Sequence, residues 1–331
     1  MRAHSTSLRV CTHDVPAAGR APGRRLSGAR PRIRPSGERR RPTLSWFALS
    51  LAAAVTQAAQ FAVLKAGARA IPPLVVVAWT QAVAFAGWLL FFAASGRAVV
   101  WPGRAWLAVV ASTLLVTAMS GLIARASARG DISVVGPVYA LSPLFTVVPD
   151  AVLTGTLPSP LGFVGIGLAV AGTVGLSRGT AAGGSLRALF RRRDAVDALL
   201  AAIFLGMLAA VDRWGALALG PASYLLCSHG TTAVATLSVC AAAMPRALAA
   251  SAAPRNVLTL VSHGVLGVTG TAMQTSALTL APASYVNAVR RLSGMIAVIL
   301  GGALFREAEV GRRLVAAALA CAGAVCLLLA R

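Results

Sequence analysis

Apolar residues dominate the chain from residue 44 onward, in long runs that short polar segments separate. The hydrocarbon core of a bilayer is about 30 Å thick, so a spanning helix needs roughly 20 apolar residues. Backbone groups in lipid must be hydrogen-bonded within their own segment, which predicts helices rather than strands. We expect ten spanning helices, at residues 44–64, 73–94, 105–125, 132–153, 160–177, 195–216, 221–243, 256–278, 283–304 and 310–330.

The ten predicted helices form two groups that echo one another. Residues 133–176 align with residues 284–327 at a constant offset of 151, which pairs Gly172 with Gly323. The earlier parts of the two groups align at an offset of 148. Two offsets so close predict one duplicated unit of five helices.

The odd number of helices in the unit decides how its two copies are related. After five crossings the second copy enters the membrane from the opposite side, so the copies become inverted repeats about an axis in the membrane plane. This arrangement is typical of secondary transporters. We therefore predict an all-α integral membrane protein of two inverted five-helix repeats, at residues 44–177 and 195–331, joined by a basic linker at 178–194. The alternative is a ten-helix scaffold or enzyme that has duplicated.

Composition agrees with a membrane protein. Hydrophobic residues make up 57% of the chain, charged residues 12%, and the mean hydropathy is +0.76. Soluble domains carry about 25% charged residues. Residues 1–43 differ, because they are rich in Arg, Pro and Gly and contain no apolar run. We expect a disordered basic tail that is not a secretory signal peptide. The Arg, Ala and Gly bias of the chain indicates a GC-rich bacterial genome, and hence the cell (inner) membrane.

The net charge of +22 does not indicate nucleic-acid binding, because the basic residues outside the tail lie mostly in loops or near helix ends. Positive loops on membrane proteins report orientation. Here the signal is divided, with fourteen Lys or Arg on one side and twelve on the other, a number that includes the eight arginines from Arg24 to Arg41 in the tail. The in or out orientation of the termini therefore depends on whether the tail is present in the native protein.

Cysteine and histidine supply no metal site. The cysteines have no metal-ligand spacing, and neither His229 nor His263 has a second and third ligand nearby. The chain also contains no phosphate-binding loop of the GxxxxGK[ST] type, so we expect no cofactor and no direct use of ATP. The expected partners are a small-molecule substrate and the lipid bilayer.

Two stretches carry the resemblance to a known family. Residues 136–145, GPVYALSPLF, with the following Gly-rich helix, resemble the fourth and fifth helices of an EamA-type domain, and residues 289–323 resemble the same domain again. The chain thus resembles the drug/metabolite transporter superfamily over residues 44–330. This resemblance implies a secondary transporter of small organic metabolites, such as amino acids or amphipathic compounds, and favours export. The acid that such domains often carry after the fourth helix is present as Glu307 but is Thr156 in the first repeat; we interpret Glu307 as a structural charge at a helix start.

Charged residues within the helices are the candidates for substrate binding, because a charge near the bilayer centre costs about 3 kcal/mol or more unless it faces protein or water. Arg290 and Arg291 are adjacent and point about 100° apart, so we expect one of them to face a central cavity. Asn287 shares a helical face with Arg291, and Tyr139 aligns with Arg290. A guanidinium there can bind a carboxylate through two hydrogen bonds. The alternative is that both arginines reach the membrane surface, or pair with Asp150 or Asp212 and lock the two halves together.

Four further charged positions receive other roles. Asp150, beside Pro149, is the candidate for proton coupling, since a cavity whose hydration alternates lets a carboxyl bind and release a proton. A salt bridge is its alternative role. Asp212 and Arg213 lie near a helix end and are interpreted as structural or gating residues. Lys65 aligns with Arg213, so the two are predicted to be symmetric anchors or gates.

Neutral polar and aromatic residues complete the predicted cavity. They supply hydrogen bonds and aromatic faces within an apolar bundle. Besides Tyr139, the candidates are Gln57, Gln60, Trp79, Gln81, Tyr224, Gln274 and Tyr285. An integral membrane enzyme acting on lipid, or a scaffold that transports nothing, is the alternative function; we find no paired acids, metal ligands or nucleophile with a base that would carry catalysis.

Overall fold

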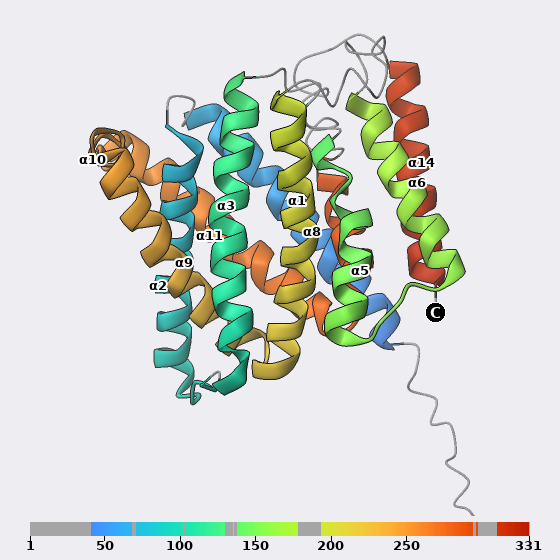
Figure 1. The fold of residues 1–331 in the computed structure, drawn as a ribbon, viewed down its shortest axis with the longest axis horizontal. Coiled ribbons are helices and arrows are strands. Elements are labelled where there is room, and N and C mark those ends of the chain that lie inside the picture. Colours follow the sequence, from blue (N-terminus) through green and yellow to red (C-terminus); the bar gives the residue numbers. More distant parts are fainter. Residues whose placement is uncertain are drawn as a thin grey trace, which may run out of the picture. The chain divides into compact units, whose positions relative to one another are not determined.

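The computed structural model describes residues 41–67, 71–101, 103–129, 135, 138–177, 193–293, 296 and 310–330, and in these residues it contains helices and no strands (Figure 1). Residues 1–40 of the basic tail and most of the linker at 178–194 lie outside the described residues, whereas residues 41–43 begin the first helix. So do Glu307 and the side chain of Lys65.

The described part of the first half of the chain contains five α-helices and one short 3-10 helix, Gly103–Ala105. The α-helices are α1 (Arg41–Gly67), α2 (Pro73–Ser95), α3 (Trp106–Arg129), α5 (Ser142–Thr154) and α6 (Pro160–Ser177). Proline opens α2, where its fixed φ suits the first turn and its missing N–H costs no hydrogen bond. Gly96 and Gly155 end α2 and α5 in the left-handed conformation, with φ of 62° and 68°. Proline and glycine therefore set these helix ends.

Six described helices make up the second half. They are α8 (Arg193–Leu219), α9 (Pro221–Ala243), α10 (Pro245–Ser251), α11 (Pro254–Leu278), α12 (Ala283–Arg290) and α14 (Val310–Leu329). The short helix α10 was not predicted; Pro245 starts it directly after the end of α9. The predicted spans 132–153 and 283–304 contain the shorter helices α5 and α12, so their full predicted lengths are not seen among the described residues.

Five of the described helices are long and apolar enough to cross a membrane: α1, α2, α3, α8 and α9. Shorter apolar helices lie within α5, α6 and α14. Helix α11 is equally long but is interrupted by polar residues on one face, among them His263, Thr271 and Gln274. Large apolar side chains such as Leu90 and Val152 are exposed at the outside of the bundle, as expected for surface that meets lipid.

The contacts between helices follow a regular pattern. Helix α3 packs on α8, and correspondingly α11 packs on α1. Helix α5 packs on α8, and α12 packs on α1. Helix α9 packs on α3, and α2 packs on α11. Helix α6 packs on α14 at one edge of the bundle, and α2 packs on α9 (Figure 1). If α1, α2, α3, α5 and α6 are exchanged with α8, α9, α11, α12 and α14, these pairings are reproduced, whereas the contacts of α8 with α9, α11 and α12 have no comparable counterpart among those of α1 in the described residues.

Small residues allow the closest of these approaches. A Cβ added to Gly172 of α6 would lie 2.5 Å from the backbone nitrogen of Ala320, and one added to Gly323 of α14 would lie 2.4 Å from that of Ala169. Any side chain at either glycine would therefore push the helices apart. The two contacts are equivalent, because Gly172 aligns with Gly323, and Ala169 aligns with Ala320, at the offset of 151.

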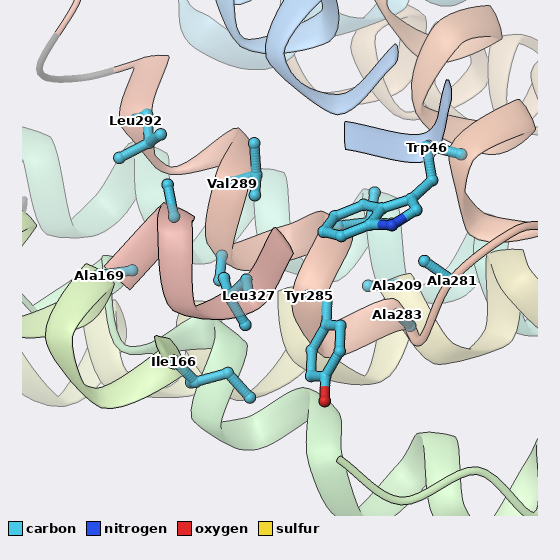
Figure 2. Packing of buried hydrophobic residues seen from close by; sticks show 14 of the residues in the cluster. Trp46, Ile166, Ala169, Ala209, Ala281, Ala283, Tyr285, Val289, Leu292 and Leu327 are labelled. Carbon is cyan, nitrogen blue, oxygen red and sulfur yellow. The ribbon is translucent and has the colours of Figure 1, made fainter. Parts of the chain in front are cut away.

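A buried apolar cluster surrounds α12 (Figure 2). Trp46 of α1 and Tyr285 of α12 face one another there, with ring centroids 6.2 Å apart. The Tyr285 hydroxyl points to the start of α6, where it accepts a hydrogen bond of 3.0 Å from the Ser159 backbone N–H. Gly162 leaves the space that this ring fills. The cluster holds α12 in the interior, where its arginines meet the cavity described next.

Candidate substrate-binding cavity

A cavity of about 240 Å³ lies in the middle of the bundle and is lined by residues of both halves. Its walls are unusually polar for the interior of an apolar bundle. The polar residues that line it are Gln57, Thr80, Gln81, Ser112, Ser120, Tyr139, Asp212, Tyr224, Ser228, His229, Thr232, His263, Thr271, Gln274, Thr275, Arg290 and Arg291.

Arg290 and Arg291 at the end of α12 both line this cavity, although the sequence predicted that one of them would. Arg290 donates a hydrogen bond of 2.9 Å from Nε to the side-chain oxygen of Gln57. The guanidinium of Arg291 lies over the Tyr139 ring, 5.5 Å from its centroid. The Nε of Arg291 is enclosed without a hydrogen-bond partner, and no carboxylate of the described residues forms a salt bridge with either arginine. Two cations therefore face the cavity with donors to spare.

Asp212 of α8 is the one acidic residue among those that line the cavity. Its Oδ1 accepts hydrogen bonds from the hydroxyl groups of Ser112, at 2.9 Å, and Tyr224, at 2.6 Å. Arg290 lies within electrostatic reach of it. The second carboxylate oxygen has no partner among the described residues, so Asp212 can still accept a hydrogen bond from a ligand.

Arg213, the neighbour of Asp212 on α8, turns away from the cavity and forms a buried ion pair. Its guanidinium lies 2.9 Å from Oδ1 of Asp150 and 2.7 Å from the hydroxyl of Thr154, and it donates to the carbonyl of Leu278 at 3.0 Å. The other oxygen of Asp150 accepts a hydrogen bond of 2.7 Å from the Ala283 N–H. This cluster joins α5, α8 and the segment between α11 and α12, and each of its charges is compensated.

Two histidines also line the cavity. His229 of α9 contacts the side-chain amide of Gln81 through Nδ1, and its Nε2 lies 3.3 Å from the Thr271 hydroxyl. His263 of α11 lies with Nδ1 at 2.9 Å from the Thr80 hydroxyl. Both rings are buried in the protein and line the cavity.

The structure brings together part of the predicted site. Of the predicted cavity residues, those that line the cavity are Arg290, Arg291, Tyr139, Gln57, Gln81, Tyr224 and Gln274, whereas Tyr285 packs beside Trp46 in the apolar cluster.

The other three predicted binding residues contact protein elsewhere. Asn287 donates to the Thr146 hydroxyl at 2.9 Å, Gln60 donates to the backbone carbonyl of His263 at 3.1 Å, and Trp79 donates to Ser251 at 2.8 Å. Asp150 does not line the cavity either, because the ion pair with Arg213 holds it between helices.

Sequence reasoning passed over the histidines and gave Asp212 another role. The repeat itself held a usable signal, because Gln81 aligns with His229 at the offset of 148. If the chain is duplicated as its sequence predicts, a cavity residue in one repeat marks a candidate at the aligned position of the other.

Comparison with known proteins adds a family and a fold. Residues 44–178 match the model of the EamA-like transporter family. No curated protein matches the sequence. Among solved structures, 28 chains match. One is a crystal structure of a protein whose description names no activity; it is 21% identical, covers 87% of this chain and 98% of its own, and has a TM-score of 0.68. At this identity the likeness shows the fold alone.

Proposed function

We propose, on the premise that residues 44–178 belong to the EamA-like transporter family, that the chain is a secondary transporter that exports small carboxylate-bearing metabolites, such as amino acids, across the cell membrane. The observation that carries the proposal is the central cavity, in which two arginines and one aspartate are left without ion-pair partners among the described residues. A buried charge without a partner is costly unless a ligand or water compensates it.

The pattern of helix contacts supports an inverted repeat with alternating access. The largest helix pairings survive exchange of the two halves, and Gly172 and Gly323 make equivalent contacts. Gln81 and His229 are equivalent by the repeat offset, and they also touch one another. Equivalent residues that touch must lie close to the axis that relates them. The cavity therefore lies where rocking of one repeat against the other would open it to each side in turn.

The chemistry of the cavity supports a substrate with a carboxylate and an ammonium group. The guanidiniums of Arg290 and Arg291 match the geometry of a carboxylate, to which arginine can donate two parallel hydrogen bonds. Asp212 supplies the negative charge for an ammonium group. A cavity of about 240 Å³ suits a solute of amino-acid size and is small for a drug-sized ligand.

Proton coupling, which the sequence assigned to Asp150, is better supported at Asp212. An ammonium group and a proton would compete for the same Asp212 carboxylate, so loading one would release the other. The groups that face this carboxylate are Ser112 of α3, Tyr224 of α9 and Arg290 of α12. The two histidines and Arg291 line the same cavity. Asp150, by contrast, is occupied by Arg213 and the Ala283 N–H.

The first test is counterflow of radiolabelled amino acids and organic acids in proteoliposomes. We expect saturable uptake by the wild type and a 10- to 100-fold loss of apparent affinity in Arg291→Ala, because a charge-assisted hydrogen bond contributes about 1.5–3 kcal/mol. Arg97→Ala is the matched control: Arg97 also lies over an aromatic ring, 5.9 Å from the centroid of Phe91, but it is exposed. Equal losses in both variants would contradict the assigned site.

The coupling assignment is tested in the same vesicles with an imposed pH gradient. Asp212→Asn should retain counterflow of organic acids that lack an ammonium group and lose the response to the gradient, whereas Asp150→Asn should retain the response in whatever protein folds. The reverse outcome would restore the assignment to Asp150. Folded protein that moves no solute but turns over lipid would indicate a membrane enzyme, and binding without either activity would indicate a scaffold.

A further inference from the structure

The hydrogen-bond network around His263 fixes which of its ring nitrogens carries a proton. The Thr80 hydroxyl lies 2.8 Å from the carbonyl oxygen of Val76, an atom that can only accept. The single hydroxyl proton of Thr80 is therefore committed to its own helix. The contact of 2.9 Å between Thr80 and Nδ1 of His263 then requires that the imidazole Nδ1–H donate to the hydroxyl.

The other ring nitrogen of His263 is consequently a bare acceptor. A neutral imidazole carries one N–H, so with the proton on Nδ1 its Nε2 offers a lone pair. No described residue hydrogen-bonds this Nε2, and the atom is not enclosed by protein, while the ring lines the cavity and is only 9% exposed. A doubly protonated ring would add a third cation to the cavity that Arg290 and Arg291 already line.

His229 provides the internal contrast. Thr271 likewise donates to its own helix, to the carbonyl of Gly267 at 2.9 Å, so the Nε2–H of His229 must donate to Thr271. Its Nδ1, which is bare in this tautomer, faces the side-chain amide of Gln81 and accepts a hydrogen bond once the amide turns its NH₂ towards the ring. Both ring nitrogens of His229 therefore have protein partners, whereas His263 keeps one free.

We infer that Nε2 of His263 accepts a hydrogen bond from the substrate, and that the preferred substrates carry a hydroxyl or amide N–H in addition to their carboxylate. The inference rests on the proposed function, in which the arginines hold the carboxylate. A buried acceptor of this kind discriminates strongly between substrates, because an analogue that lacks the donor leaves the acceptor without a hydrogen bond.

The experiment uses substrate pairs in which a hydroxyl or amide NH₂ is replaced by methyl: serine and 2-aminobutyrate, threonine and valine, glutamine and its methyl-ketone isostere. Each is offered as a competitor in counterflow to wild-type protein and to His263→Asn and His263→Gln. Asparagine keeps the donor to Thr80 but has no atom at the Nε2 position, whereas glutamine restores an acceptor there.

We expect the wild type to prefer the donor-bearing member of at least one pair by about 10-fold, a preference that His263→Asn abolishes and His263→Gln partly restores. A purely structural role would weaken both members of each pair equally, and that result would overturn the inference. So would a wild type that transports amino acids without discriminating within any pair. If no carboxylate competes at all, and Arg291→Ala behaves like the wild type, the result contradicts the proposed function on which the inference rests.

Discussion

Arg213 and Arg291 are equally buried, at 8% and 9% exposure, yet their surroundings differ completely. Arg213 spends its donors on Asp150, Thr154 and the carbonyl of Leu278. Arg291 lies over the Tyr139 ring, its Nε has no partner, and no described carboxylate pairs with it. Burial alone does not distinguish a structural charge from a binding charge.

The difference lies in whether the hydrogen-bonding capacity of each group is used. A buried ion pair whose remaining donors and acceptors are satisfied contributes to a defined packing of helices and has nothing left for a ligand. A buried cation with free donors is unstable by itself and gains from an incoming anion. The Arg213 cluster therefore serves the fold, and the cavity arginines serve binding.

The largest effect is expected from breaking the structural pair. Arg213→Met leaves Asp150 charged and without its ion-pair partner, so we expect the free energy of unfolding to fall by about 3–5 kcal/mol. Thermal or SDS-induced unfolding in detergent micelles measures the change. The double variant Asp150→Ala with Arg213→Met should lose much less than the sum of the single variants, because neither charge remains. Additive losses would show that the two residues do not act as a pair.

The second prediction is that replacing Arg291 does not lower the free energy of unfolding. Arg291→Met removes a buried charge without a carboxylate partner, so we expect stability to stay constant or to rise by about 1–2 kcal/mol while transport falls. The same unfolding measurement and the counterflow assay, made on one preparation, test both halves of the prediction. A loss of stability as large as that of Arg213→Met would erase the contrast between the two arginines.

The smallest effects should come from the hydroxyl groups around each site. Thr154→Val removes a partner of both Asp150 and Arg213 and should lower the free energy of unfolding by about 1 kcal/mol. Ser112→Ala removes a donor to Asp212 and should alter the pH dependence of transport more than stability. Stability that falls equally in both variants would indicate that Asp212 is also part of the framework.

Several features of the fold followed from sequence because they depend on local chemistry. Prolines open α2, α9 and α11 near the predicted starts, and Gly96 and Gly155 end helices in the conformation that glycine adopts without strain. The alignment of Tyr139 with Arg290 also anticipated that both would line one cavity.

The site was only partly predictable, because neighbours on a helix point in different directions. Asp212 and Arg213 are adjacent in sequence and were assigned one role, yet one faces the cavity and the other faces Asp150. Likewise, the cost of burying Asp150 suggested a proton carrier, and only the position of Arg213 reveals the compensating charge. The polar face of α11 was visible in the sequence, but which helix it would meet was not.

The sequence by itself determined that this chain is a helical membrane protein, because the length of its apolar runs is a property of the chain alone. Only the tertiary structure decided which charges are satisfied and which await a ligand. Hydrogen bonds and ion pairs reach only a few ångströms. Their partners here can lie more than two hundred residues apart in the sequence, as Arg290 and Gln57 do. Packing alone brings such partners together.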